Sequence, residues 1–194
     1  RSGEVWKRDR AGGLCLTDGG IETTLILHDG FDLPCFAAFP LLKDDAGRQA
    51  VADYFRRHAA IARVAGTGFI LESATWRASP DWAAKLNCSA ADLEAANRTA
   101  IAMLHDLRRE FETEGAPAVV SGCVGPPGDG SDPGTTMQAA EAGAYHPPRI
   151  ATHAEAGAAP WSATPRPNAT KAPGVPARAG PAGEPAATAP TLTR

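Results

Sequence analysis

Three short apolar runs, separated by helical patterns, dominate the first 158 residues of the chain. Leu14–Asp18 is the first run, and two glycines follow it, as when a buried strand ends in a tight turn. Gly68–Ser73 repeats this pattern, with Glu72 near its end. Ala118–Val124 is the third run and leads into a Gly-Pro-Pro turn. These runs predict three β-strands.

Apolar residues at helical spacing fill the intervals between the runs. One such stretch opens at Asp44-Asp45 and continues to Val64. Another begins at Ser89, where Asp92 three residues later completes a capping-box signature, and it continues to Phe111. A weaker helical pattern covers residues 137–156 and is interrupted by two consecutive prolines. The resulting order is β-α-β-α-β followed by one further helix.

This alternation predicts an α/β domain over residues 1–158, with parallel strands side by side and helices outside them. The pattern fits either an open doubly wound sheet or a closed barrel. Alanine and proline make up half of residues 159–194, which predicts a low-complexity, disordered tail. Because prolines lack the N–H that a central strand donates, residues 159–165 are expected to form no strand. A small flavodoxin-like domain is a further alternative, but it needs more strands than the pattern contains.

Composition narrows the class of protein. With 19 Lys and Arg against 22 Asp and Glu, the 194-residue chain has a formal net charge of −3 and lacks the basic footprint of a nucleic-acid-binding protein. No apolar run approaches the roughly 20 residues that span a bilayer, and the charged start of the chain lacks a signal-peptide pattern. We therefore expect a cytoplasmic protein without nucleic-acid or membrane partners. Its four widely spaced cysteines are expected to be free thiols.

The candidate chemistry lies where the predicted strands end. In parallel α/β folds the ligand binds beyond the carboxyl ends of the strands, and these ends carry Asp18 with two glycines and Glu72. Two carboxylates facing one mouth would suit a small polar ligand with an ammonium or hydroxyl group. Alternatively, Asp18 and Glu72 cap helices or pair with Arg77. The spacing alone leaves both interpretations open.

Three segments in register, residues 16–23, 71–76 and 121–126, resemble the first three strand ends of homocysteine S-methyltransferases. The resemblance implies a (β/α)₈ TIM-type barrel, of which this chain holds about three βα units. It also implies that homocysteine and a methyl donor are the small-molecule substrates. In such an enzyme zinc holds the sulfur as a thiolate, which attacks the donor and gives methionine.

The resemblance also assigns residues to the site. By position, it implies that the substrate-binding residues are Asp18, Gly19, Gly20, Glu22, Thr23, Glu72 and Thr75. The family's zinc is held by three cysteines on late strands, and this chain lacks the stretch where they would lie. Cys123 falls in the third strand-end motif and is expected to be a buried thiol rather than a zinc ligand. The histidines have no metal-type spacing, which favours solvated or capping roles.

Two hypotheses of function follow. The first is a methyltransferase domain of methionine biosynthesis that is truncated here and inactive alone. The second is a non-enzymatic half-barrel fragment that acts by binding or assembly. Its exposed barrel edges predict self-association. The tail is then either a genuine linker or the product of a shifted reading frame.

Overall fold

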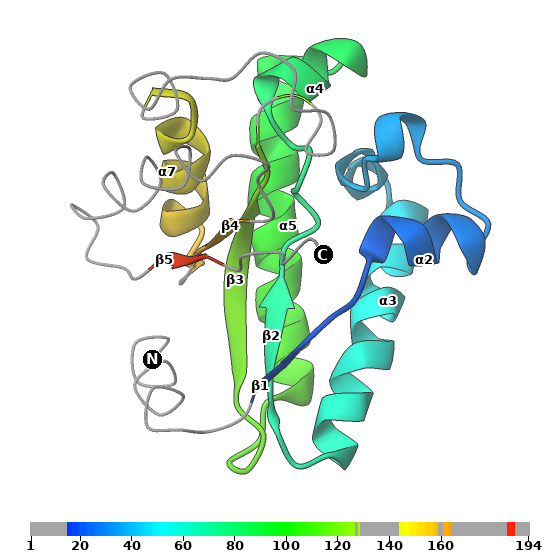
Figure 1. Ribbon diagram of the computed structural model, residues 1–194, viewed down its shortest axis with the longest axis vertical. Coiled ribbons are helices and arrows are strands. Elements are labelled where there is room, and N and C mark those ends of the chain that lie inside the picture. The colour runs from blue at the N-terminus through cyan, green and yellow to red at the C-terminus, as the bar shows by residue number, and fades with distance from the viewer. Residues whose placement is uncertain (1–14, 127, 129–143, 159–160, 164–185, 189–194) are drawn as a thin grey trace, which may run out of the picture.

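A parallel sheet forms the centre of the computed structural model, which describes residues 15–126, 128, 144–158, 161–163 and 186–188 (Figure 1). Each strand pairs in parallel with the next one along the chain. This sequential order excludes the flavodoxin-like alternative, in which the first strand would lie between the second and third. It is the order expected for successive units of a barrel. The strands are β1 (Cys15–Thr17), β2 (Gly68–Glu72), β3 (Ala118–Val124), β4 (Trp161–Ala163) and β5 (Ala186–Thr188).

The helices pack beside the sheet in the order α3, α5, α7, with α5 in contact with both others (Figure 1). The long pair, α3 and α5, matches the two stretches predicted from helical spacing. Two short helices and two 3₁₀ turns were not predicted. The α-helices are α2 (Ile21–Leu27), α3 (Asp45–Val64), α4 (Pro80–Lys85), α5 (Ala90–Phe111) and α7 (Pro147–Glu155), and the 3₁₀ turns are η1 (Pro34–Phe36) and η2 (Phe39–Lys43).

The helix starts follow local capping chemistry. The side chain of Ser89 accepts a hydrogen bond from the backbone N–H of Asp92, and the carboxylate of Asp92 accepts one from the N–H of Ser89 in return. This confirms the predicted capping box. The two prolines at 147–148 lie in the first turn of α7, where no N–H donors are needed, and a break at His146 separates α7 from the helical residues 144–145, so the predicted interruption lies at the start of α7. The part of the predicted helix before residue 144 lies outside the described residues.

The core lies between the helices and the sheet. Phe55 of α3 and Leu104 and Leu107 of α5 are almost completely buried, as is Leu71 of β2. Each such side chain contributes about 1.5 to 3 kcal/mol when it leaves water. Only one face of α3 and of α5 is buried, which explains why their sequences show a 3.6-residue apolar period. The sheet and its two long helices therefore hold the strand ends in place.

The expectation that residues 159–165 form no strand is wrong, since β4 pairs in parallel with β3. The pairing involves residues 161–163 alone, so the prolines at 160 and 165 flank the strand and leave its N–H groups available. A second short strand, β5, follows at Ala186–Thr188. The predicted disorder of the other tail residues concerns positions outside the described residues.

No helix in the described ranges combines the length and the apolar character needed to cross a membrane.

Candidate functional site

A pocket of about 220 Å³ opens where β1 and β2 end. Its wall comes from the turn after β1, the start of α2, the end of β2 with the segment that follows, and the last part of β3. This is the position predicted from the strand-end rule. The lining residues are Asp18, Gly19, Gly20, Ile21, Glu22, Glu72, Ser73, Ala74, Trp76 and Cys123.

Asp18 follows β1 directly, and its side chain is hydrogen-bonded to a residue of α3 rather than to an arginine. Its Oδ2 atom accepts a hydrogen bond of 2.8 Å from the hydroxyl of Tyr54 on α3. Burial raises the pKa of Asp18 to about 6, and the Tyr54 hydrogen bond and the charge of His58 act in the opposite direction. Asp18 is therefore partly protonated near neutral pH.

Two glutamates share the pocket with Asp18. Burial raises the pKa of Glu72 to about 7, and the neighbouring charge of Asp18 adds to this effect. Burial also raises the pKa of Glu22, which lies in the first turn of α2. Arg77 acts in the opposite direction on Glu22 as a weaker influence. The pocket thus concentrates carboxylates that are poorly solvated, an arrangement that favours a bound cation.

Side-chain hydrogen bonds join the ends of β2 and β3 behind the pocket. The backbone N–H of Cys123 donates to Ser73 Oγ at 2.8 Å, and Thr75 Oγ1 donates to the backbone oxygen of Cys123 at 2.9 Å. The two hydroxyl oxygens lie 2.6 Å apart. All three residues are buried, so these bonds continue the strand pairing beyond Glu72. They hold the carboxylate-bearing strand end rigidly.

Close backbone contacts also shape the wall. Gly125, which follows β3, lies against Trp76, and a Cβ atom at position 125 would overlap the backbone oxygen of Trp76. Gly19 and Gly20 are exposed and line the pocket without side chains, which lets a ligand approach their backbone.

Arg77 lies in an aromatic environment beside the pocket. Its guanidinium carbon is 4.0 Å from the ring centre of Trp82 and 4.6 Å from that of Trp76. It also donates to the backbone oxygen of Cys35. Cys35 and Phe36 have positive φ angles of 57° and 53°, which are unfavourable for residues with side chains. Arg77 thereby contributes to holding this strained turn in place.

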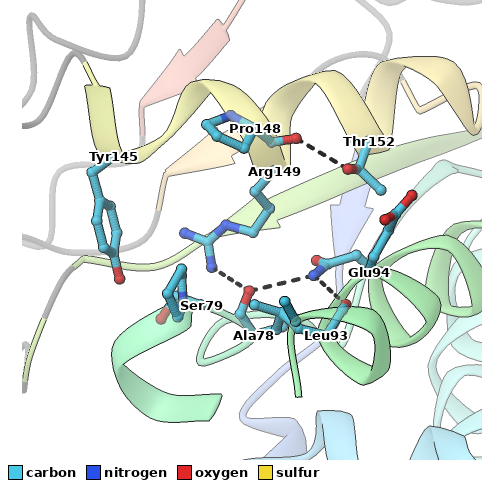
Figure 2. A pocket seen from close by; sticks show the side chains of 11 residues that line it. Ala78, Ser79, Leu93, Glu94, Tyr145, Pro148, Arg149 and Thr152 are labelled. Carbon is cyan, nitrogen blue, oxygen red and sulfur yellow. Dashed lines mark hydrogen bonds between the residues drawn. The ribbon is translucent and has the colours of Figure 1, made fainter. Parts of the chain in front are cut away.

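A second pocket, of about 260 Å³, lies between α4, α5 and α7 (Figure 2). Arg149 points toward Ala78, and its guanidinium donates to the backbone oxygens of Ala78 and Gly125 at 3.1 and 2.9 Å. Asn97 donates to the backbone oxygen of Leu93 at 2.9 Å. Because these polar groups serve the protein's own backbone, the pocket with the carboxylates is the better candidate site.

Next to this second pocket, one expectation about histidines is wrong. His146 and His153 are buried, with 1% and 0% exposure, rather than solvated. His153 Nε2 lies 2.9 Å from Asn97 Oδ1, so the pair links α7 to α5. Burial lowers the pKa of His153 to about 3, and the histidine is therefore neutral. The scattered sequence positions of the histidines do not reveal this burial.

Most of the predicted substrate residues meet at the candidate pocket, and two do not line it. Thr23 is exposed on α2 beside Gly20, and Thr75 is fully buried in the link between β2 and β3. Tyr54 lies within the helix predicted from Asp44-Asp45 to Val64, and no sequence signal separates its hydroxyl from a core ring. Five predicted residues line the pocket: Asp18, Gly19, Gly20, Glu22 and Glu72.

The described residues do not provide a set of metal ligands. Among them, no group of three or more His, Cys, Asp or Glu side chains is placed to hold a metal ion. Within the described residues none of the four cysteines forms a disulfide, and Cys123 is the buried one among them. A zinc site of three cysteines therefore does not fit the described arrangement of thiols.

Comparison with known proteins shows which family and which solved structures the chain is similar to. A family model described as homocysteine S-methyltransferase matches residues 15–172. Two crystal structures of the homocysteine methyltransferase MmuM from Escherichia coli have the same fold, the metallated form with a TM-score of 0.73 and 18% identity and the oxidised form with 0.74 and 20%. They cover 94% and 96% of this chain, which spans 64% of the length of each. No curated protein sequence matches the chain significantly.

Proposed function

Since the chain belongs to the homocysteine S-methyltransferase family, we propose that its carboxylate pocket binds the amino-acid end of homocysteine. Asp18 and Glu72 accept hydrogen bonds from the ammonium group. The backbone at Gly19 and Gly20 lies against the rest of the ligand. The observation that carries the proposal is the meeting of Asp18, Glu22 and Glu72, from three different elements, in one pocket.

The chemistry of the pocket supports an ammonium ligand. A carboxylate that burial has made hard to ionise gains most from a nearby positive charge, because the charge replaces the lost water. Binding of the ammonium should therefore lower the pKa of Asp18 and Glu72 and release protons. A pocket of about 220 Å³ is also of a size for a small amino acid rather than a large cofactor.

Methyl transfer is a separate part of the proposal. When bound, zinc would hold the sulfur of homocysteine as a thiolate. Because the described thiols do not fit a three-cysteine site, we assign no step of this chain to the metal. We propose that the isolated chain binds homocysteine and does not form methionine from it.

Calorimetric titration of the full chain tests the binding step. L-homocysteine is compared with 4-mercaptobutanoate, which has the same thiol and carboxylate and lacks the ammonium group. We expect the analogue to bind at least about tenfold more weakly, since it leaves the half-buried carboxylates of Asp18 and Glu72 without a cationic partner. Asp18→Asn and Glu72→Gln should each reduce this discrimination.

The matched control is Asp53→Asn, which removes an exposed carboxylate of α3 and should leave the affinity unchanged. Equal affinity for the two compounds, or no binding of either, would overturn the proposed function. Formation of methionine by the isolated chain, supplied with zinc and a methyl donor, would overturn the second part.

A further inference from the structure

We propose that Tyr54 is a positioning residue for the candidate pocket: its hydroxyl orients the Asp18 carboxylate and sets the pH range in which Asp18 can accept a ligand's ammonium group. The second half of this inference rests on the proposed function. Tyr54 lies on α3, outside the pocket lining, and acts through Asp18 alone.

The geometry makes Tyr54 a fixed donor. Its side chain is 0% exposed, and its ring meets Phe55 edge to face at 5.3 Å and His58 at 4.4 Å between ring centres. The His58 ring is held in turn by a 2.9 Å contact between its Nδ1 atom and the backbone oxygen of Tyr54. A ring packed in this way has little rotational freedom. The 2.8 Å bond to Asp18 Oδ2 therefore determines where that carboxylate points.

A tyrosine at position 54 supplies a hydrogen-bond donor, which a phenylalanine there would lack. Phe55, the next residue, is equally buried and fills the core without a hydroxyl. Burial first, and then the charge of Asp18, raises the pKa of Tyr54, which keeps its proton on the phenol. Toward an ionised Asp18, the phenol can therefore act only as a hydrogen-bond donor. Since an aspartate accepts several hydrogen bonds, occupation of Oδ2 leaves capacity for a ligand.

Charged groups on three elements face Asp18. On α3, Tyr54 and His58 favour its ionised form, whereas Glu22 on α2 and Glu72 on β2 carry the same charge as Asp18. Arg77, after β2, acts on Glu22. Tyr54 is thus the main side chain that offsets the effect of burial on the pKa of Asp18. Without it, Asp18 would stay protonated to a higher pH and could not pair with an ammonium group there.

Carbon-13 NMR of aspartate-labelled chain tests the first half without any ligand. The signal of Asp18 is assigned by its loss in Asp18→Asn. In Tyr54→Phe we expect its titration midpoint to rise by about one pH unit, the equivalent of a tenfold change in ionisation. Tyr145→Phe is the matched control, because Tyr145 donates to Asp81 away from the pocket. It should leave Asp18 unchanged.

One measurement does not depend on whether Tyr54→Phe folds. In the unaltered chain labelled at tyrosine Cζ, the Tyr54 signal should move with the same midpoint as Asp18, and the Tyr145 signal should not. The inference would be overturned if the Asp18 midpoint were equal in the unaltered chain and in Tyr54→Phe. It would also be overturned if the Tyr54 chemical shift did not change as Asp18 titrates.

Homocysteine titrations over a range of pH test the second half. Near pH 5, Tyr54→Phe should bind about tenfold more weakly than the unaltered chain, and the difference should shrink to about twofold near pH 7 and vanish at higher pH. An affinity loss that is the same at every pH would indicate a merely structural role and overturn it. If the unaltered chain does not bind homocysteine, the proposed function fails, whereas the Asp18 titration still decides the role of Tyr54.

Discussion

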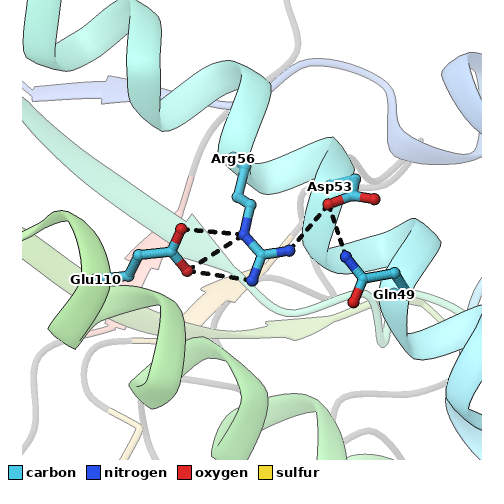
Figure 3. A network of polar contacts seen from close by, with 4 residues as sticks. All are labelled: Gln49, Asp53, Arg56 and Glu110. Carbon is cyan, nitrogen blue, oxygen red and sulfur yellow. Dashed lines mark hydrogen bonds and ion pairs between the residues drawn. The ribbon is translucent and has the colours of Figure 1, made fainter.

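Carboxylates occur in two contrasting settings in this chain, the pocket at the strand ends and the surface between α3 and α5. In the pocket, burial raises the pKa of Asp18 and Glu72 to about 6 and 7. On the surface, Arg56 donates to both Asp53 and Glu110, at 2.9 and 3.1 Å (Figure 3). There the pKa of Asp53 is lowered, first by the hydrogen bond from Gln49 and then by that from Arg56.

The two settings differ in how the charge of a carboxylate affects the stability of the fold. A surface carboxylate keeps its water and gains a cation, so its charge costs little. A pocket carboxylate loses water and stands beside others of the same charge, which opposes folding whenever it is ionised. Such groups are expected where a ligand supplies the missing charge.

The largest effect should come from Gly125→Ala, which disrupts the pocket wall without touching a carboxylate. The new methyl group would overlap the backbone oxygen of Trp76, and backbone cannot move aside as a flexible side chain can. We expect the free energy of unfolding to fall by about 3 kcal/mol. Urea denaturation measures this. Gly115→Ala is the control, because a Cβ there meets nothing within 4 Å, and an equal loss in both variants would contradict the prediction.

An intermediate effect of the opposite sign is expected from Glu72→Gln. The pKa of Glu72 is about 7 in the folded chain against an ordinary value of 4.5. The folded state therefore binds its proton more tightly than the unfolded state does. Stability from this group is present below the ordinary pKa and is lost as the pH rises through 7. Replacing Glu72 should raise the free energy of unfolding by about 2 kcal/mol near pH 8 and by almost nothing near pH 4.

Urea denaturation at several pH values checks this, with Asp53→Asn as the surface counterpart. Because the pKa of Asp53 is lowered in the folded chain, its replacement should destabilise the chain slightly near neutral pH. If Glu72→Gln were less stable than the unaltered chain near pH 8, ionised Glu72 would not be destabilising, and the prediction would be wrong.

The smallest effect is expected for Arg56→Gln on the surface. Its ion pairs with Asp53 and Glu110 are largely exposed to water, so their loss should lower the free energy of unfolding by only about 0.5 kcal/mol. Thermal unfolding in low salt and in about 1 M NaCl separates the charge effect from packing, since salt screens exposed charges. A loss that persists in high salt would mean that the stem of Arg56 matters more than its charge.

Local signals predicted much of this fold. The strand runs before Asp18 and Glu72 and the capping box at Ser89 depend on neighbouring residues alone, and each was found where the pattern placed it. The prolines on either side of β4 misled the prediction, because the effect of a proline depends on whether it lies inside an element or at its edge. Pro147 begins α7, and the prolines around residues 161–163 leave the strand free to pair.

The alternation of strands and helices follows from the order of apolar runs and helical stretches along the chain, and it fixes the edge of the sheet at which Asp18 and Glu72 lie. Parallel strands bring their carboxyl ends together whatever the side chains are. The hydrogen bond from Tyr54 to Asp18, and the one from Thr75 to the backbone of Cys123, become visible only in the folded chain. These contacts join residues 36 and 48 positions apart in the chain. Their geometry depends on how α3 packs against the sheet and how β3 pairs with β2, which no local pattern records.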